Sequence, residues 1–278
     1  MPELPEVETM VRGIQKDCTN RTVERLEFVR SRRRPIPVFP ARASVVRRMA
    51  NRRILGVTRL AKRIVLALDS EDVMIIEPRM TGLLLISPPP TQAHRRVVWH
   101  LNPSKGLADQ LEFWDRRGLG TVSLLNTSEL AELRARLGPD ALEITFEEWK
   151  TQLNSTSRAI KVALLDQHLV AGIGNLYASE ILHRAGISPL RSATTLGPRR
   201  LARLDEATKH ILQEAILYEG STLNDGTYRN ALNKDGTYQN HHRVYQRAGQ
   251  QCASCKKSII QRIVQAQRAT FFCSRCQK

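Results

Sequence analysis

Two closely spaced cysteine pairs near the end of the chain constrain the fold more than any other feature. Their spacing is Cys-x2-Cys-x17-Cys-x2-Cys, formed by Cys252, Cys255, Cys273 and Cys276. Each pair can present two thiolates to one tetrahedral metal ion, while the intervening residues return the chain. Two disulfides or four free thiols are the alternatives, but the N-terminal sequence does not resemble an export signal, and this disfavours disulfides. We therefore predict one structural Zn²⁺, with the remaining cysteine, Cys18, as a small core residue.

The chain is strongly basic. Its 278 residues hold 43 Lys and Arg against 27 Asp and Glu, a formal net charge of +16. Residues 151–278 carry +10 of this charge and residues 1–150 carry +6. Such a bias indicates a polyanionic partner, with nucleic acid first and a membrane surface second. No apolar run approaches the roughly 18–20 residues that a membrane span needs, so we expect an intracellular protein that binds nucleic acid.

The first half of the chain is typical of a β-rich domain behind one N-terminal helix. Apolar residues recur at helical spacing over residues 4–16. Residues 22–125 are then predicted to be strands and turns, because short β-rich runs alternate with turn signals such as the three prolines at 88–90. Many short strands at near-regular spacing indicate a β-sandwich or a barrel. A short helix is expected over residues 128–137.

The pattern becomes helical after about residue 150. Helices are expected around residues 160–165, over 176–186 and from about Pro198 to 216. Residues 219–250 are polar and rich in turn signals, including Asn224-Asp225-Gly226. Long loops in compact proteins are often functional, so this segment is a candidate binding loop.

The sequence begins Met1-Pro2-Glu3, which offers an unusual nucleophile. A small second residue permits removal of the initiator methionine, and Pro2 would then carry a free secondary amine. An α-amine titrates at about pH 7.7–8.0, so a neutral fraction exists near neutrality. A neutral amine can attack electrophilic carbon, and a secondary amine gives a permanently charged iminium. The alternative is a merely rigid terminus. Glu3 beside it either complements the helix dipole or acts as a general acid or base.

Two features of the basic half are typical of phosphate binding. Gly172, Gly174 and Asn175 form a glycine-rich turn into a helix, where free backbone N–H groups can bind an anion. Arg268 is expected on a hairpin between the two cysteine pairs, either as a solvated charge or as a phosphate clamp. The scattered histidines are interpreted as surface or structural residues.

Eight motifs spread along nearly the whole chain carry a resemblance to one family. They are PELPEVE at 2–8, Ala61-Lys62, Met80-Thr81-Gly82, Asp115-Arg116-Arg117, Leu137-Gly138-Pro139, IK…LLDQ at 160–167, GIGNLYASEIL at 172–182 and QRATFFC at 267–273. Together with the cysteine pattern they resemble the formamidopyrimidine-DNA glycosylase family of bacterial base-excision repair. The resemblance implies an α+β chain. A β-sandwich with an N-terminal helix (1–137) would precede a helix–two-turn–helix domain (150–220), a lesion-recognition loop region (221–243) and a four-cysteine zinc finger (244–278).

The same resemblance implies an activity and its residues. The chain would be a bifunctional glycosylase and AP lyase that excises oxidised purines, such as 8-oxoguanine and formamidopyrimidines, from duplex DNA by β,δ-elimination. The implied catalytic residues are the nucleophile Pro2, its acid/base neighbour Glu3, the lysine Lys62, and Arg268 in the second elimination. The implied DNA-binding residues are Asn175, which clamps phosphates with Arg268; Met80 and Arg117, which fill the gap left by the flipped base; and Arg96, at the position of a DNA-contacting histidine. We expect a cytoplasmic, nucleoid-associated monomer that binds damaged double-stranded DNA and no membrane.

Besides Arg96, the sequence departs from the family pattern at several places. Leu119 stands where the family has a wedge phenylalanine, and Glu77-Pro78-Arg79 replace His-Leu-Gly. Two other functions stay open. One is a sister glycosylase for oxidised pyrimidines, which would share the nucleophile and the zinc module. The other is a non-catalytic binder of damaged DNA, which predicts a blocked or displaced Pro2.

Overall fold

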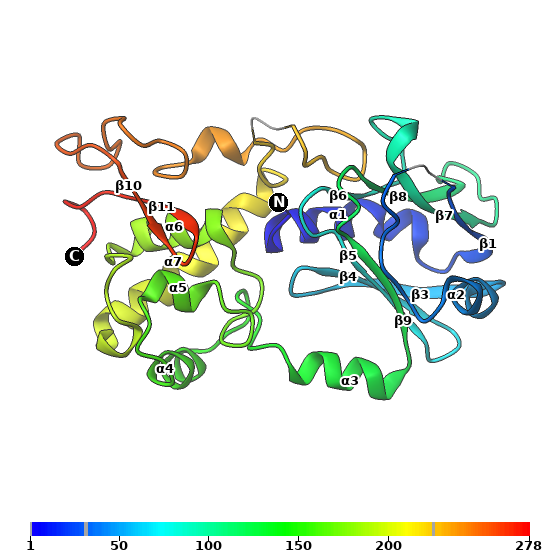
Figure 1. Ribbon diagram of the computed structural model, residues 1–278, viewed down its shortest axis with the longest axis horizontal. Coiled ribbons are helices and arrows are strands. Elements are labelled where there is room, and N and C mark those ends of the chain that lie inside the picture. Colours follow the sequence, from blue (N-terminus) through cyan, green and yellow to red (C-terminus); the bar gives the residue numbers. More distant parts are fainter. Residues whose placement is uncertain (1, 31–32, 224–225) are drawn as a thin grey trace. The chain divides into compact units, whose positions relative to one another are not determined.

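The computed structural model describes residues 2–30, 33–223 and 226–278 (Figure 1). Met1 and the Asn224-Asp225 part of the expected turn therefore lie outside the described residues. The chain forms two compact units. The first comprises Met1–Ala135 and Tyr218–Gln239, and the second comprises Arg136–Leu217 and Asn240–Lys278.

The first unit begins with the predicted amphipathic helix, which extends slightly further than expected. Helix α1 spans Leu4–Cys18. Its apolar stripe, which includes Val7, Met10 and Ile14, is fully buried. Cys18 lies on the same buried stripe, and burial raises the pKa of its thiol to about 12. A thiol with so high a pKa is unreactive near neutrality, so the prediction of a core residue is confirmed.

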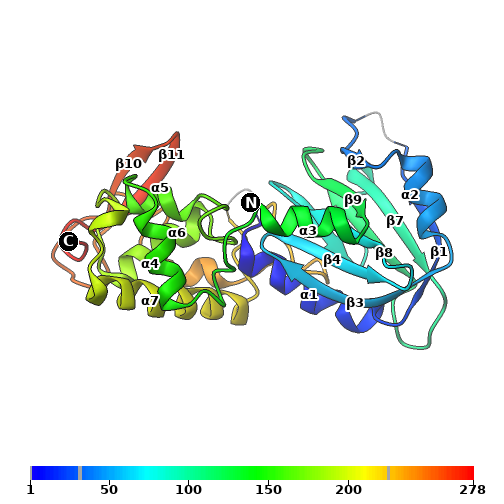
Figure 2. The same cartoon turned by 90° about the horizontal axis from the view of Figure 1, so that it is seen from below.

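The β-rich region forms one sheet in two halves (Figure 2). Its strands are β1 (Thr22–Phe28), β2 (Val38–Phe39), β3 (Arg52–Leu60), β4 (Arg63–Leu68), β5 (Val73–Glu77), β6 (Gly82–Leu85), β7 (Arg95–Leu101), β8 (Gln110–Asp115) and β9 (Thr121–Leu125). The strand order is β2-β9-β5-β4-β3-β1-β7-β8-β6. Only two residue pairs join β1 to β3, so the sheet is nearly divided there. Side chains of both halves and of α1 share one core, which confirms the predicted sandwich.

The prediction of only strands and turns over residues 22–125 is wrong at one place. Helix α2 spans Arg42–Met49. Val45 and Met49, four residues apart, are both fully buried. The segment is short and rich in arginine, so its apolar signal is confined to one turn of helix, too little for periodicity to reveal. The expected short helix after β9 is present as α3, Thr127–Ala135.

The polar segment Tyr218–Gln239 folds against the first unit. The Ile86 amide donates to the Ala231 carbonyl at 3.0 Å, and the Thr237 amide donates to the Tyr218 carbonyl at 2.9 Å. The expected lesion-recognition loop region, residues 221–243, overlaps this segment. The segment is therefore held by backbone hydrogen bonds to itself and to the end of β6.

The second unit is helical, as predicted. Its helices are α4 (Phe146–Asn154), α5 (Ile160–Leu164), α6 (Asn175–Ala185) and α7 (Pro198–Leu217). Short 3-10 turns occur at Ala193–Thr195 (η2) and Tyr238–His241 (η3). The residues of η3 belong partly to the first unit and partly to the second. Helix α4 begins before residue 150, because Thr145 accepts a hydrogen bond from the Glu148 amide and caps it. Gly186 ends α6 in the left-handed conformation, at φ 68°. No helix in the described part of the chain is long and apolar enough to span a membrane.

A small module closes the second unit. Strands β10 (Gln261–Gln265) and β11 (Arg268–Phe272) form an antiparallel hairpin. Beneath it lies a small core built from Val244, Ile260, Phe271 and the thiols of Cys252 and Cys273. So small a core is a poor source of stability by itself, which is typical of modules that fold around a metal ion.

Candidate functional site

The start of α1 is fixed by Glu6. The Glu3 amide donates a hydrogen bond to Glu6 Oε2 at 2.8 Å, and Glu6 Oε1 accepts one from the Ser221 amide at 2.9 Å. Glu3 and Glu6 are almost fully buried, and Pro2 just before them is buried as well. The Glu6 carboxylate therefore joins the terminus that carries Pro2 to the segment Tyr218–Gln239. Sequence reasoning missed this role, because the helix dipole alone explains an acidic residue in a first helical turn.

The Tyr218–Gln239 segment is shaped around the same carboxylate. Gly220 has φ +78°, and a Cβ there would lie 2.9 Å from both Cγ and Oε1 of Glu6. Only glycine satisfies both the backbone angle and the close approach. The Tyr228 hydroxyl, buried below, donates to the Glu219 carbonyl at 3.0 Å. The loop therefore meets the N-terminal site through the Ser221 backbone amide and through the Tyr228 hydroxyl, which also donates to the Glu6 carbonyl at 3.4 Å.

Lys62 and Met80 lie at turns of the same unit. Lys62 stands between β3 and β4, directly after Ala61 at φ 55°, and its side chain is half-buried. Met80 follows Arg79, which has φ 53°, and is also half-buried between β5 and β6. Backbone strain of this kind is concentrated at functional turns.

The turn that carries Arg117 is organised by a buried carboxylate. Asp115 is fully buried; its Oδ1 accepts from the Thr81 hydroxyl and from the Arg117 amide at 3.1 Å, and its Oδ2 accepts from the Gly120 amide at 2.8 Å. The Arg117 side chain is exposed, while Leu119 is half-buried. The turn thus presents Arg117 outward from a rigid base.

Arg96 lies deeper than a surface phosphate contact. Its side chain is only 5% exposed; Nε donates to the Asp115 carbonyl at 2.9 Å, and Nη1 donates to the Arg34 carbonyl at 3.1 Å. Burial lowers the pKa of its guanidinium. It also lines a cavity of about 230 Å³ together with Arg30, Arg33 and Arg42. In the structure Arg96 ties the turn of Asp115 to the segment that contains Arg34.

In the second unit, the start of α6 meets the zinc-module hairpin. Asn175 donates from Nδ2 to the Ala269 carbonyl at 3.0 Å, and the fully buried Lys161 donates from Nζ to Asn175 Oδ1 at 2.5 Å and to the Ala269 carbonyl at 3.3 Å. Arg268, the preceding residue, is exposed. The structure therefore holds Asn175 against the residue that follows Arg268. Sequence reasoning missed Lys161; the available signal was a lysine at an apolar position of α5.

A buried carboxylate on α6 holds the chain before the zinc module. Glu180 is fully buried. It accepts hydrogen bonds from three consecutive amides, those of Arg243, Val244 and Tyr245, at 2.9, 2.9 and 2.8 Å. Sequence reasoning missed this residue as well.

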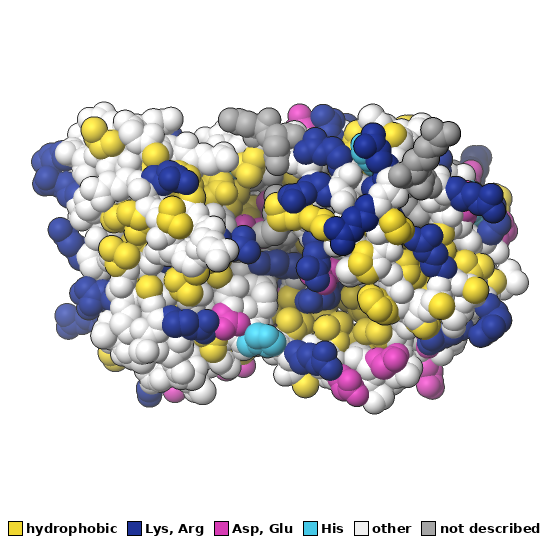
Figure 3. Space-filling view, in the orientation of Figure 1, with side chains coloured by type: hydrophobic (Ala, Val, Ile, Leu, Met, Phe, Trp, Pro, Cys, Tyr) yellow, Lys and Arg dark blue, Asp and Glu magenta, His cyan; other side chains and the backbone are white. Residues whose placement is uncertain are grey.

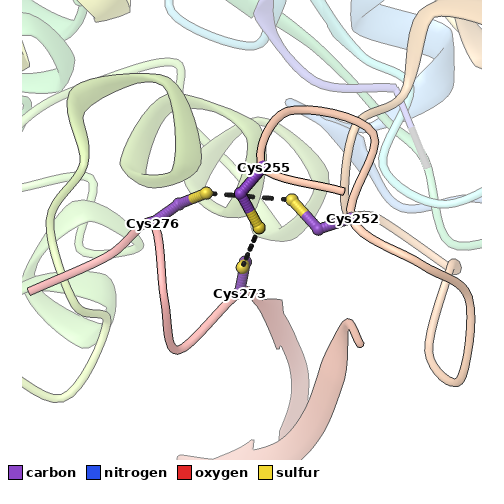
Figure 4. Close-up of side chains that lie close together, drawn as sticks. All are labelled: Cys252, Cys255, Cys273 and Cys276. Carbon is purple, nitrogen blue, oxygen red and sulfur yellow. Dashed lines mark hydrogen bonds between the residues drawn. The ribbon is translucent and has the colours of Figure 1, made fainter. Parts of the chain in front are cut away.

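The four paired cysteines form one cluster (Figure 4). Their sulfur atoms all lie within 4.8 Å of one another, and two separations, Cys252 to Cys276 and Cys255 to Cys273, are 3.8 Å. A tetrahedron with Zn–S bonds of about 2.3 Å has edges of about 3.8 Å, so the donor set fits zinc. The site is a structural Zn²⁺ site, because four thiolates leave no open coordination position.

The surface charge agrees with a polyanionic partner. On the face drawn in Figure 3, Lys and Arg side chains are widespread and Asp and Glu are sparse. The chain's net charge of +16 has the same sign. A positive surface steers an anionic polymer toward the protein at long range.

Comparison with known proteins identifies the family. Three family models match: the formamidopyrimidine-DNA glycosylase N-terminal domain at residues 1–122, its H2TH domain at 137–227, and a zinc finger found in FPG and IleRS at 249–278. Formamidopyrimidine-DNA glycosylases from Chloroflexus aurantiacus and Herpetosiphon aurantiacus are 41% and 38% identical over 100% of this chain and 98% and 100% of theirs.

Solved structures give the same result. The MutM (FPG) protein of Thermus thermophilus has a TM-score of 0.85 at 34% identity, covering 99% of this chain and 98% of that one. A Lactococcus lactis FPG mutant, in complex with DNA that contains Fapy-dG, has a TM-score of 0.86 at 29% identity and covers 100% of both chains. With matching models over most of its length and relatives that align end to end, the chain belongs to the formamidopyrimidine-DNA glycosylase family.

Proposed function

We propose that the chain is a bifunctional DNA glycosylase and AP lyase that excises oxidised purines from duplex DNA. The observation that carries the proposal is the buried N-terminal site, in which Pro2 and Glu3 precede α1 and Glu6 connects them to the Tyr218–Gln239 segment. The names of the curated relatives and the Fapy-dG DNA of the Lactococcus lactis complex support the substrate class. Such an enzyme acts on chromosomal DNA and would be associated with the nucleoid.

The chemistry follows from a secondary amine beside carboxylates. Once Met1 is removed, the Pro2 nitrogen attacks the sugar C1′, and the bond from C1′ to the base breaks as the base takes up a proton. The attached nitrogen then gives up its proton, the C1′–O4′ bond of the sugar ring breaks as O4′ takes up a proton, and an iminium forms between C1′ and the Pro2 nitrogen. This iminium acidifies the C2′ proton. Loss of that proton expels the 3′ phosphate, and a second elimination expels the 5′ phosphate. Glu3, which follows the amine in the sequence, is proposed to move protons beside it, and Lys62 is proposed to act near the lesion and its phosphates.

The second unit would hold the DNA while a base is extruded. Extrusion costs a few kcal/mol, and contacts to phosphates offset that cost. Arg268 and Asn175 are proposed to clamp the phosphates beside the lesion, and Lys161 links Asn175 to Ala269, the residue after Arg268. Met80 and Arg117 are proposed to fill the space that the base leaves. Bound zinc supplies no chemistry to the reaction and fixes the hairpin that carries Arg268.

Borohydride trapping tests this function directly. Duplexes carrying 8-oxoguanine, a formamidopyrimidine, an oxidised pyrimidine or no lesion are incubated with the protein and reductant. We expect a covalent product with the oxidised purines, and its N-terminal peptide should contain modified Pro2. Replacement of Pro2 by Glu, a large second residue that retains Met1, should abolish trapping. Pro5→Ala, which leaves the terminal amine in place, should preserve it.

Each other outcome identifies a different function. Trapping only on the oxidised pyrimidine would establish the sister activity. Binding to damaged DNA with no trapped product, although mass spectrometry shows a free Pro2 amine, would show a non-catalytic binder. Either result would contradict the proposal.

A further inference from the structure

A histidine on helix α6 contacts the zinc site. His183 is 5% exposed, and its Nε2 lies 3.7 Å from Sγ of Cys252, which is fully buried. The distance lies within the range of hydrogen bonds to sulfur, which are longer than those to oxygen. The other ring nitrogen, Nδ1, is buried and has no hydrogen-bond partner among the described residues. The sulfur is therefore the partner that the structure offers this ring.

The chemistry of the two atoms decides which one donates. Cysteine binds zinc as the thiolate, which has lone pairs and no proton. A bare Nε2 facing a thiolate would bring two lone pairs together inside the protein. Only an Nε2–H group makes the contact favourable, whatever the state of Nδ1. His183 therefore has to be the donor when zinc is bound.

Zinc with four thiolates carries a net charge of −2, and the small module core around it is largely apolar. Hydrogen bonds from outside the ligand shell spread this charge and orient the sulfur atoms. His183 is well placed for this task, since Cys252 is buried and turned toward α6 rather than toward water.

We propose that His183 is a positioning residue of the zinc site: its Nε2–H donates to the Cys252 thiolate and anchors helix α6 to the metal centre. The same helix holds the Ala269 carbonyl through Asn175 at its start and residues 243–245 through Glu180 in its middle. With His183 near its end, α6 contacts the zinc module and the chain before it at three points. These contacts hold the zinc site and the hairpin that carries Arg268 in fixed positions relative to Asn175.

Two substitutions and one control test the proposal in the zinc-loaded full chain. His183→Phe keeps a buried ring and removes the donor, whereas His183→Gln places an amide N–H near the position of Nε2. Ile181→Val trims a fully buried residue of the same helix and serves as the packing control. Transfer of zinc to a chromophoric chelator should be about tenfold faster for His183→Phe, the scale of lost outer-shell contacts. His183→Gln should recover much of the loss, and the control should match the wild type.

Cobalt substitution gives a readout that packing alone does not move. A hydrogen bond lowers the energy of the sulfur lone pairs, so its removal should shift the sulfur-to-cobalt charge-transfer band of His183→Phe to longer wavelength. The band should stay in place for His183→Gln and Ile181→Val. An unchanged band together with unchanged zinc transfer in His183→Phe would overturn the proposal.

A third measurement needs no variant, in case His183→Phe does not fold. In ¹⁵N-labelled wild type loaded with ¹¹³Cd, the Nε2–H proton of His183 should exchange slowly and show coupling to the metal across the hydrogen bond. A His183 ring whose Nε2 carries no proton would refute the assignment. These readouts are independent of lesion chemistry, so they stand or fall separately from the proposed glycosylase activity.

Discussion

The three amides held by Glu180 allow a quantitative test of how α6 supports the zinc module. Oε2 accepts from the Arg243 amide, while Oε1 accepts from both the Val244 and Tyr245 amides. Glu180→Gln preserves the shape of the side chain and keeps one oxygen for two amides. Its new NH₂ group then faces the Arg243 N–H, so two donors meet in a fully buried site.

The magnitude follows from the individual contacts. Leaving one buried donor unsatisfied costs about 1–3 kcal/mol, and the two surviving bonds each lose about 1 kcal/mol when their acceptor becomes neutral. An opposing effect exists, because burial raises the pKa of Glu180 against the influence of the three amides. The neutral side-chain amide of Glu180→Gln avoids the cost of burying a charge, so part of the lost stability is recovered. We expect a net destabilisation of about 2 kcal/mol.

Glu214 offers a matched control on the same partner. It accepts from Nη1 of Arg243 at 3.3 Å, with both side chains partly exposed. Glu214→Gln should cost less than about 1 kcal/mol, as is usual for exposed ion pairs. Urea unfolding of the zinc-loaded variants, followed by far-ultraviolet circular dichroism, measures both changes. Equal destabilisation by the two substitutions would show that the buried amides do not depend on the Glu180 carboxylate.

Three further predictions concern pH, DNA and metal. His242 is 5% exposed, and burial lowers its pKa from 6.5 to about 4. The unfolded chain therefore binds the proton more readily than the folded chain. The contribution of neutral His242 to folding stability is complete above pH 6.5 and is lost as the pH falls toward 4. Between pH 7 and pH 5 the wild type should lose about 2 kcal/mol more unfolding free energy than His242→Phe, and equal losses would contradict the assignment. Asn175→Ala and Arg268→Ala should weaken binding to every lesion alike, and Arg268→Ala should reduce the salt slope by about one; selective loss for one lesion in fluorescence anisotropy titrations would indicate base contacts instead. Elemental analysis should find one Zn²⁺ per chain, and chelation should unfold residues 244–278, as seen by rapid amide hydrogen exchange; active protein without zinc would refute this.

Local sequence patterns predicted most of the fold, because the start, the end and the buried face of a helix or strand depend mainly on neighbouring residues. The apolar stripe of α1, the short strands of the sandwich and the glycine that ends α6 each follow from a few neighbouring residues. Helix α2 was not predicted, because its buried face consists of Val45 and Met49 within an arginine-rich segment. The cysteine cluster was predictable for the opposite reason: thiolate chemistry allows few other uses of that spacing.

The organising residues of the site were not predictable in this way. Glu6, Lys161 and Glu180 each have an ordinary local explanation, as a first-turn acid, a helical lysine and a helical acid. Their partners lie far along the chain, at Ser221, Ala269 and residues 243–245. Local reasoning has no access to such pairs, because the same residue types usually face solvent.

The contacts of the Arg96 side chain do not follow from the resemblance alone. A matching position predicts where the backbone of a residue lies, but not where the end of a longer side chain goes. The Arg96 guanidinium donates to the carbonyls of Asp115 and Arg34. Two neutral acceptors now hold a buried cation, and the cavity beside it is lined by three more arginines. Arg96 therefore ties the turn that presents Arg117 to the segment that contains Arg34, and its contact with DNA stays a prediction.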